Sequence, residues 1–357
     1  MKMRYAAILL ALGLCACAAQ APQPQAVAPA ECRADFERVC THISGQQQLS
    51  ACVRDNIAEI SRPCRRALRA LRDTSAEPTA PNDDSGSAAE APRLAPSLAN
   101  IIYRTPPAGV PPEAVSLDFY RGPEGVRAPL VVFIHGGGWR NGDKRGGERG
   151  QPGAMAQAGF AYASLNYRLL EHGRPHVAAD DIAAAIASLR NQADEYGIDP
   201  DRIAIMGHSA GAHLAALVGL DPTYLRSHGV PTTSVRALVL LDGAGYDIPN
   251  QIDRGGNAAL YRSVFGDDAD YWRRMSPLSH ADRAGLPAAL IHHSEGRAAS
   301  RLQAQALAEA LRTAGGEAQV HEALGEDHAS INRGFGEPGD ETTRLTMAFL
   351  AAHLRAP

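Results

Sequence analysis

The feature that most constrains this chain is an alternation of short apolar runs with helical stretches between residues 97 and 357. Five runs have the composition of strands buried on both faces, at 130–134, 161–165, 203–206, 235–241 and 288–291. Helical stretches follow several of them, at 178–196, 210–219, 299–313 and 342–354. This alternation predicts an α/β fold, in which helices cover both faces of a mainly parallel sheet. Functional residues are then expected at the carboxyl ends of the strands.

A serine follows one of these strands in the pattern G-x-S-x-G. The motif GHSAG occupies residues 207–211, directly after the run 203–206 and directly before a helix. A tight strand–turn–helix connection of this kind exposes the serine hydroxyl and requires small neighbours. The amino end of the helix also favours a developing negative charge. We therefore predict Ser209 as a nucleophile.

A glycine-rich turn follows the strand 130–134, where the sequence reads HGGGW at residues 135–139. Consecutive glycines let backbone N–H groups approach an oxyanion closely. The amides of Gly137 and Gly138, together with that of Ala210, are predicted to form an oxyanion hole.

These motifs, with NYRL at 166–169 and a late histidine, resemble esterases of the α/β-hydrolase fold over residues 97–357. The resemblance is to the branch that contains kynurenine formamidases, feruloyl-type esterases and hormone-sensitive-lipase-like carboxylesterases. It implies that Tyr167 and Arg168 support the oxyanion loop, and that no cofactor is needed. The pair His292-His293 lacks metal-ligand spacing, so no metal is expected.

The resemblance also implies a small cap over the nucleophile between residues 243 and 280. We predict that Trp139 and His208 contact the substrate. Aromatic side chains of the cap either shape an apolar pocket or simply pack the cap on the body of the domain; they are Tyr246, Tyr261, Phe265, Tyr271 and Trp272.

The general base is expected after the last strand, in the segment EDHAS at 326–330. Because an imidazole can accept the serine proton and return it to the leaving group near neutral pH, we predict His328 for this role. The related esterases carry an Asp shortly after the strand 288–291, but the sequence here reads HHSEGR at 292–297. Glu295 is the predicted acid, and Asp242 at the end of the preceding strand is the alternative.

Four cysteines lie close together ahead of this domain, at positions 32, 40, 52 and 64. An even number of cysteines close together in an exported chain predicts disulfides. Four cysteines form two disulfides, with three possible pairings. Helical periodicity runs through this segment, so we predict a small cysteine-rich helical module at 31–72. It resembles the cysteine-rich repeat of a Golgi membrane glycoprotein and of bacterial exported proteins. A Ser-, Pro- and Ala-rich stretch at 73–96 predicts a flexible linker.

The first 19 residues have the pattern of a secretory signal: Lys2 and Arg4, a short apolar run, then small residues. The stretch Leu14-Cys15-Ala16-Cys17 resembles a bacterial lipobox, so residues 1–16 are a possible lipoprotein signal. Lipidation at Cys17 or ordinary cleavage near Ala19 both remain open. We expect an exported protein, periplasmic or anchored in the outer membrane.

Composition narrows the function further. The formal net charge is −4, with no basic stripe, so a nucleic-acid partner is not expected. The sequence favours a serine hydrolase that cleaves small or medium carboxylic esters through an acyl-enzyme. The alternatives are an arylformamidase-type amide hydrolase and a non-catalytic binding protein that retains the fold. The sequence carries no signal for an oligomeric state.

Overall fold

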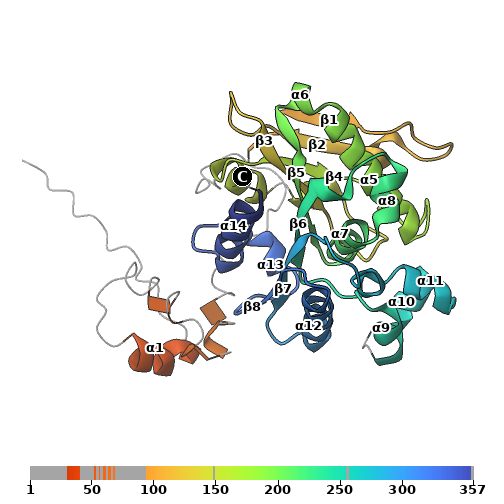
Figure 1. Cartoon of the computed structure of the whole chain (residues 1–357). Coiled ribbons are helices and arrows are strands. Elements are labelled where there is room, and N and C mark those ends of the chain that lie inside the picture. Colours follow the sequence, from red (N-terminus) through yellow and green to blue (C-terminus); the bar gives the residue numbers. More distant parts are fainter. Residues whose placement is uncertain are drawn as a thin grey trace, which may run out of the picture.

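A computed structural model describes residues 30–40, 52–53, 56, 59–61, 63–65, 67–68, 94–147, 149–254 and 257–354. Its main element is an eight-stranded sheet in the order β1-β2-β4-β3-β5-β6-β7-β8 (Figure 1). The strands are β1 (Leu98–Ile102), β2 (Ser116–Tyr120), β3 (Ala128–Ile134), β4 (Ala161–Leu165), β5 (Ile198–His208), β6 (Val235–Leu241), β7 (Ala288–Ser294) and β8 (Ala318–Ala323). Strand β2 pairs antiparallel with β1 and β4, and the other neighbouring pairs are parallel. The predicted mainly parallel sheet is confirmed.

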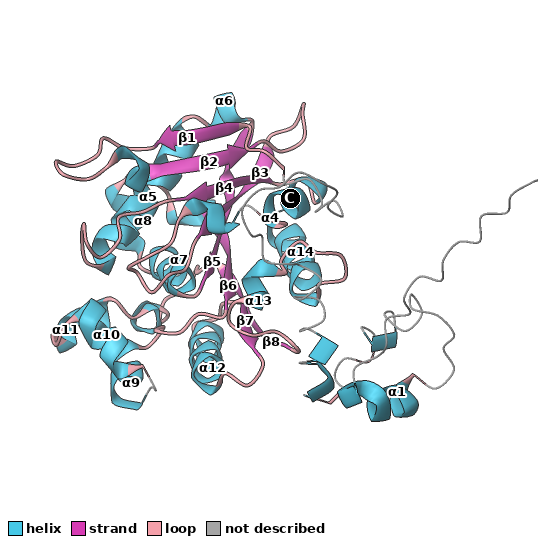
Figure 2. Cartoon of the chain, turned by 180° about the vertical axis from the view of Figure 1, so that it is seen from behind, coloured by secondary structure: helices cyan, strands magenta, loops and turns pink. Residues whose placement is uncertain are grey.

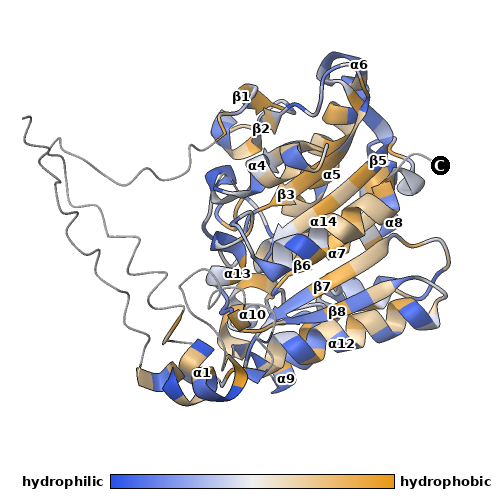
Figure 3. Ribbon diagram, turned by 90° about the vertical axis from the view of Figure 1, so that its left-hand side faces the viewer, coloured by the Kyte–Doolittle hydropathy of each residue, from blue (hydrophilic) through white to orange (hydrophobic). Residues whose placement is uncertain are grey.

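Alternate residues of the central strands face two separate hydrophobic cores. In β3, Val132 and Ile134 belong to one core, and Val131 and Phe133 to the other. The first core is covered by α5 (Pro175–Asn191), α7 (Ala210–Leu220) and α12 (Ala298–Thr313), and the second by α4 (Gln151–Gln157) and α14 (Glu341–Leu354). Figure 3 shows the hydrophobic colouring of the central strands between these helices. Shorter helices complete the body: α6 (Ala193–Tyr196), α8 (Pro222–Ser227) and α13 (Ser330–Arg333).

Three short helices between β6 and β7 form the cap, and Figure 2 shows them grouped together. They are α9 (Ile248–Arg254), α10 (Ala258–Phe265) and α11 (Ala269–Arg274). Four of the five cap aromatics are buried in the first core, and Trp272 is partly buried against it. The cap aromatics therefore pack the cap on the body.

The cysteine module contains α1 (Arg33–Val39) and two disulfides, Cys32–Cys64 and Cys40–Cys52. Its described core consists of Cys32, Ile60 and Cys64. Figures 1 and 2 both place α1 near the β8 edge of the sheet. The predicted signal (1–19, with Cys17) and residues 73–93 of the predicted linker lie outside the described residues. In the described part of the chain, no helix is long and apolar enough to cross a membrane.

Candidate active site

Ser209 lies at a sharp turn between β5 and α7. Its φ is 56° and its ψ is −119°, a backbone conformation that residues other than glycine rarely adopt. The turn is tight because Gly207 and Gly211 lie against each other: a Cβ on Gly207 would lie 2.3 Å from the Gly211 carbonyl oxygen. The backbone N–H of Ser209 donates to the Leu241 carbonyl oxygen at 2.9 Å. The structure thus has the strained turn expected of a nucleophile elbow.

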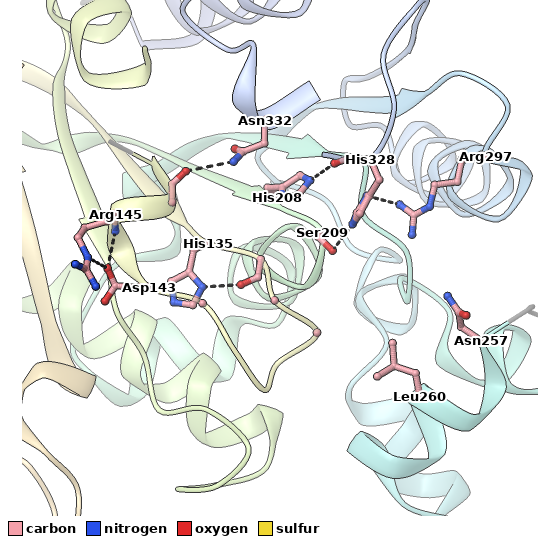
Figure 4. A pocket seen from close by; sticks show the side chains of 15 residues that line it. His135, Asp143, Arg145, His208, Ser209, Asn257, Leu260, Arg297, His328 and Asn332 are labelled. Atoms are coloured by element: carbon pink, nitrogen blue, oxygen red, sulfur yellow. Dashed lines mark hydrogen bonds and ion pairs between the residues drawn. The ribbon is translucent and has the colours of Figure 1, made fainter. Parts of the chain in front are cut away.

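His328 comes from the loop between β8 and α13, and its ring reaches the serine. Nε2 of His328 lies 2.9 Å from Oγ of Ser209. The backbone oxygen of His328 accepts a hydrogen bond of 2.7 Å from Nε2 of His208, which fixes the loop beside Ser209. Figure 4 shows Ser209 and His328 facing each other at one side of the pocket.

Asp242 is the carboxylate that contacts His328. It follows β6 directly, its side chain is fully buried, and its Oδ2 lies 2.7 Å from Nδ1 of His328. Ser294 donates to this carboxylate twice, through its backbone N–H and its hydroxyl, each at 2.9 Å. Burial alone would raise the pKa of Asp242, but the hydrogen bond with His328 and the positive charge of Arg297 outweigh it and hold the pKa well below its usual range. Asp242 is therefore ionised at neutral pH.

The predicted acid, Glu295, is not at this position, and that prediction was wrong. Its carboxylate accepts hydrogen bonds from Arg65 of the cysteine module and from the backbone N–H of Gly325. The physical reason is that Arg65 and the Gly325 N–H bind the Glu295 carboxylate, while Asp242, at the end of β6 beside β5, makes the contact with His328. Glu295, one strand further along, points away toward the module.

The glycine-rich loop at 135–139 lies against Ser209. A Cβ on Gly136 would lie 3.0 Å from Cβ of Ser209, so only glycine fits there without displacement. Gly137 and Gly138 have φ of +121° and +61° and line the same pocket as Ser209. The Tyr167 hydroxyl donates to the carbonyl oxygen of His135 at 2.9 Å, which anchors the loop.

The pocket around Ser209 has a volume of about 800 Å³. Leu260 and Asn257 line it from the cap side, and Asp143 and Arg145 line it from the loop after HGGGW (Figure 4). His208 also lines it, and burial, as the main cause, lowers the pKa of His208 to about 4.

Trp139 does not reach the pocket, contrary to its predicted substrate contact. Its side chain is buried and packs edge-on against Tyr261 and Phe265, with ring centroids 5.7 and 5.1 Å away. Its indole N–H donates to Nδ1 of His213 at 3.2 Å. The positive φ of Trp139, 62°, turns the side chain inward from the glycine loop.

Arg297 is a site residue that sequence reasoning missed. Its Nη1 lies 2.6 Å from Oδ2 of Asp242 and 2.7 Å from Nδ1 of His328. The sequence signal for Arg297 is its place in HHSEGR at 292–297, the segment in which the related esterases carry the acid.

Among the described residues, no group of three or more His, Cys, Asp or Glu side chains is placed to hold a metal ion. The contacts run from Ser209 to His328 and from His328 to Asp242. A nucleophile, a base and an orienting acid make contacts in this sequence in a catalytic triad.

Comparison with known proteins agrees with this fold. Thermogutta terrifontis esterase 2 superposes in several structures: phosphonylated by sarin, it gives a TM-score of 0.61 at 24% identity, covering 74% of this chain and 98% of that one. Phosphoramylated by tabun, it gives 0.59 at 25% identity, covering 72% and 96%. The fold is that of the α/β-hydrolases. The BD-FAE family model matches residues 117–311, more than half of the chain, and the chain belongs to this family.

Curated relatives are similar over part of their length. Esterase LipQ of Mycobacterium tuberculosis is 31% identical over 211 residues, which are 56% of this chain and 50% of LipQ. A probable isoprenylcysteine alpha-carbonyl methylesterase of Arabidopsis thaliana, ICMEL1, is 30% identical over 220 residues, 57% of this chain and 46% of that protein. The chain spans about half the length of these relatives.

Proposed function

We propose that this protein is a serine carboxylesterase. The observation that carries the proposal is the chain of contacts from Ser209 Oγ to His328 Nε2 at 2.9 Å, and from His328 Nδ1 to Asp242 Oδ2 at 2.7 Å. The names of the relatives, LipQ and the methylesterases, support the same class of reaction.

In the proposed mechanism, Ser209 Oγ attacks the ester carbonyl carbon while His328 Nε2 takes the hydroxyl proton. Asp242 holds the imidazole in the required tautomer and stabilises its protonated form. The oxyanion of the tetrahedral intermediate accepts hydrogen bonds from the amides of Gly137, Gly138 and Ala210. The intermediate collapses, the alcohol leaves with the proton from His328, and water activated by the same base hydrolyses the acyl-enzyme.

The pocket favours small or medium esters. A volume of about 800 Å³ suits a compact ligand. Structures of the Thermogutta esterase carry butyrate and propionate, which supports a short acyl group here. His208, neutral at pH 7, and Leu260 are the proposed contacts on either side of the scissile bond.

The test is hydrolysis of p-nitrophenyl butyrate, with an aryl formamide assayed alongside. Ser209→Ala should lower kcat/KM by about 10⁴-fold or more, judging from triad dissections. Ser227→Ala, an exposed serine at the end of α8, serves as the matched control and should keep full activity. A Ser209→Ala variant with the kcat/KM of wild type would contradict the mechanism. Lack of a fluorophosphonate adduct on the folded wild type would favour a binding protein instead.

We also propose that the protein is exported and lipid-anchored, with a lipoprotein signal in residues 1–16 and the lipid on Cys17. The signal-like composition and the two disulfides support export, because disulfides persist in oxidising compartments. Cys17→Ser should abolish incorporation of a labelled fatty acid and release the protein from the membrane fraction. Retention of the label in the variant would exclude Cys17 as the anchor.

A further inference from the structure

Glu295 connects the cysteine module to the loop that carries His328. Arg65 Nε donates to Glu295 Oε2 at 3.1 Å, and a second guanidinium nitrogen donates to the other carboxylate oxygen. The two side chains are 8% and 12% exposed, so this is a nearly buried, two-bond ion pair between residues 230 positions apart in the sequence. Such a geometry is specific to arginine, whose planar fork matches a carboxylate.

The module fixes Arg65 from its own side. Arg65 follows Cys64, which is bonded to Cys32 in the small core of the module. The guanidinium also donates to the backbone oxygen of Ile60. The disulfide at Cys64 and the bond to Ile60 therefore hold the Arg65 guanidinium in place where it meets Glu295.

On the other side, Glu295 lies between the two segments that hold the triad. Its Oε2 accepts the Gly325 N–H at 2.9 Å, and its own N–H donates to the Glu326 carbonyl oxygen at 3.0 Å, two residues before His328. The residues around it, Ser294 and Arg297, both bind Asp242. A shift of Glu295 would thus move the loop that carries His328 together with the residues that bind Asp242.

We propose that Arg65 is a positioning residue for the esterase reaction, and that the cysteine module is a working part of the active site. This inference rests on the proposed function. The module supplies the positive charge that the buried Glu295 carboxylate requires, and the ion pair holds the His328 loop at reacting distance from Ser209. Removing Arg65 takes away the two-bond partner of this nearly buried carboxylate, and we expect Glu295 and the loops bonded to it to shift toward water.

The first test is Arg65→Met in the full chain, which keeps the length of the side chain and removes the charge. We expect kcat for p-nitrophenyl butyrate to fall by about tenfold or more, because small displacements of catalytic groups are costly. KM should change less than about twofold, because Arg65 does not line the pocket. Arg33→Met, an exposed arginine in α1 of the same module, is the matched control and should match wild type.

The decisive test is rescue. The double variant R65M/E295Q removes both charges but keeps an amide oxygen that can accept the Gly325 N–H. It should recover most of the lost kcat. A double variant no faster than Arg65→Met, or an Arg65→Met variant with wild-type kcat, would overturn the proposal. If Arg65→Met does not fold, Arg65→Lys retains the charge without the fork, and it should show a several-fold lower kcat with unchanged KM; a wild-type kcat would again overturn the proposal.

A readout independent of turnover separates this inference from the proposed function. Amide hydrogen exchange of residues 325–331 should be faster in Arg65→Met than in wild type, and should return toward wild type in R65M/E295Q. If wild type hydrolyses no ester, the proposed function fails, and the exchange comparison still decides whether Arg65 holds the loop. Unchanged exchange in Arg65→Met would reject the role of Arg65.

Discussion

Backbone strain is concentrated at single residues around the pocket. Four described residues other than glycine have a positive φ, and three of them are Trp139, Ser209 and Asp242. Ser209 and Asp242 each stand directly after a strand, where the chain must turn sharply to present a side chain at the sheet edge. Strained conformations of this kind cost about 1–3 kcal/mol each and persist where the surrounding structure enforces them. The strain at Asp242 is a second observation, beside its contact with His328, that favours a functional role for this residue.

Two carboxylates close to the site have different expected effects. Asp242→Asn keeps the shape of the side chain but removes the acceptor that orients the imidazole, so kcat should fall by about 10³–10⁴-fold. Glu295→Gln should cost only about tenfold, the loss expected from weakening its pair with Arg65, because Glu295 does not touch the imidazole. Steady-state kinetics on a short-chain ester compares the two variants directly. Equal losses in both would contradict the assignment of Asp242 as the acid.

At the scale of elements, the strands buried on both faces were predictable, and the β1–β2 edge of the sheet was not. The runs that became β3 to β7 are continuous and apolar, because each lies between helices. Strand β2 carries Asp118, which is buried against Nζ of Lys144 at 2.6 Å, and this polar position interrupts the apolar pattern.

The same reasoning explains which site residues were predictable. Ser209 and His328 stand in local motifs. The partner of His328 depends on which strand ends lie side by side, and strand order is a tertiary property that no local motif encodes.

The close contact of α7 with β3 gives a test at this scale. A Cβ on Gly211 would lie 2.1 Å from the Ile134 carbonyl oxygen and 2.5 Å from that of His135. Gly211→Ala should therefore lower the free energy of unfolding by about 1–3 kcal/mol and displace α7, the helix that follows Ser209. Gly153→Ala in α4, where a Cβ meets nothing within 4 Å, is the control and should be neutral or slightly stabilising. Thermal melting measures both; a Gly211→Ala variant as stable as the control would contradict the packing argument.

Across the whole molecule, the site is assembled at the carboxyl edge of the sheet from the ends of β3, β5, β6 and β8. Three described histidines lie close to this edge: His135 and His213 are buried, and His208 is partly exposed and lines the pocket. Burial, as the first cause, lowers the pKa values of His135, His208 and His213 to about 4. These rings are neutral in the folded protein near pH 7, and each is hydrogen-bonded to a backbone carbonyl oxygen. The stability of the folded state therefore depends on pH through histidines other than His328.

The direction of that dependence follows from proton uptake. An unfolded histidine has an ordinary pKa of about 6.5, so between pH 6.5 and 4 the unfolded chain binds protons that the folded chain does not. Stability is then highest above pH 6.5 and falls as the pH is lowered toward 4. His213→Gln keeps a donor for the Met275 carbonyl and an acceptor for the Trp139 N–H but does not titrate. Between pH 7 and 4.5, wild type should lose about 2 kcal/mol more of its unfolding free energy than this variant, as measured by urea denaturation at the two pH values. If the two proteins lose the same amount, His213 is not the neutral, buried group described here.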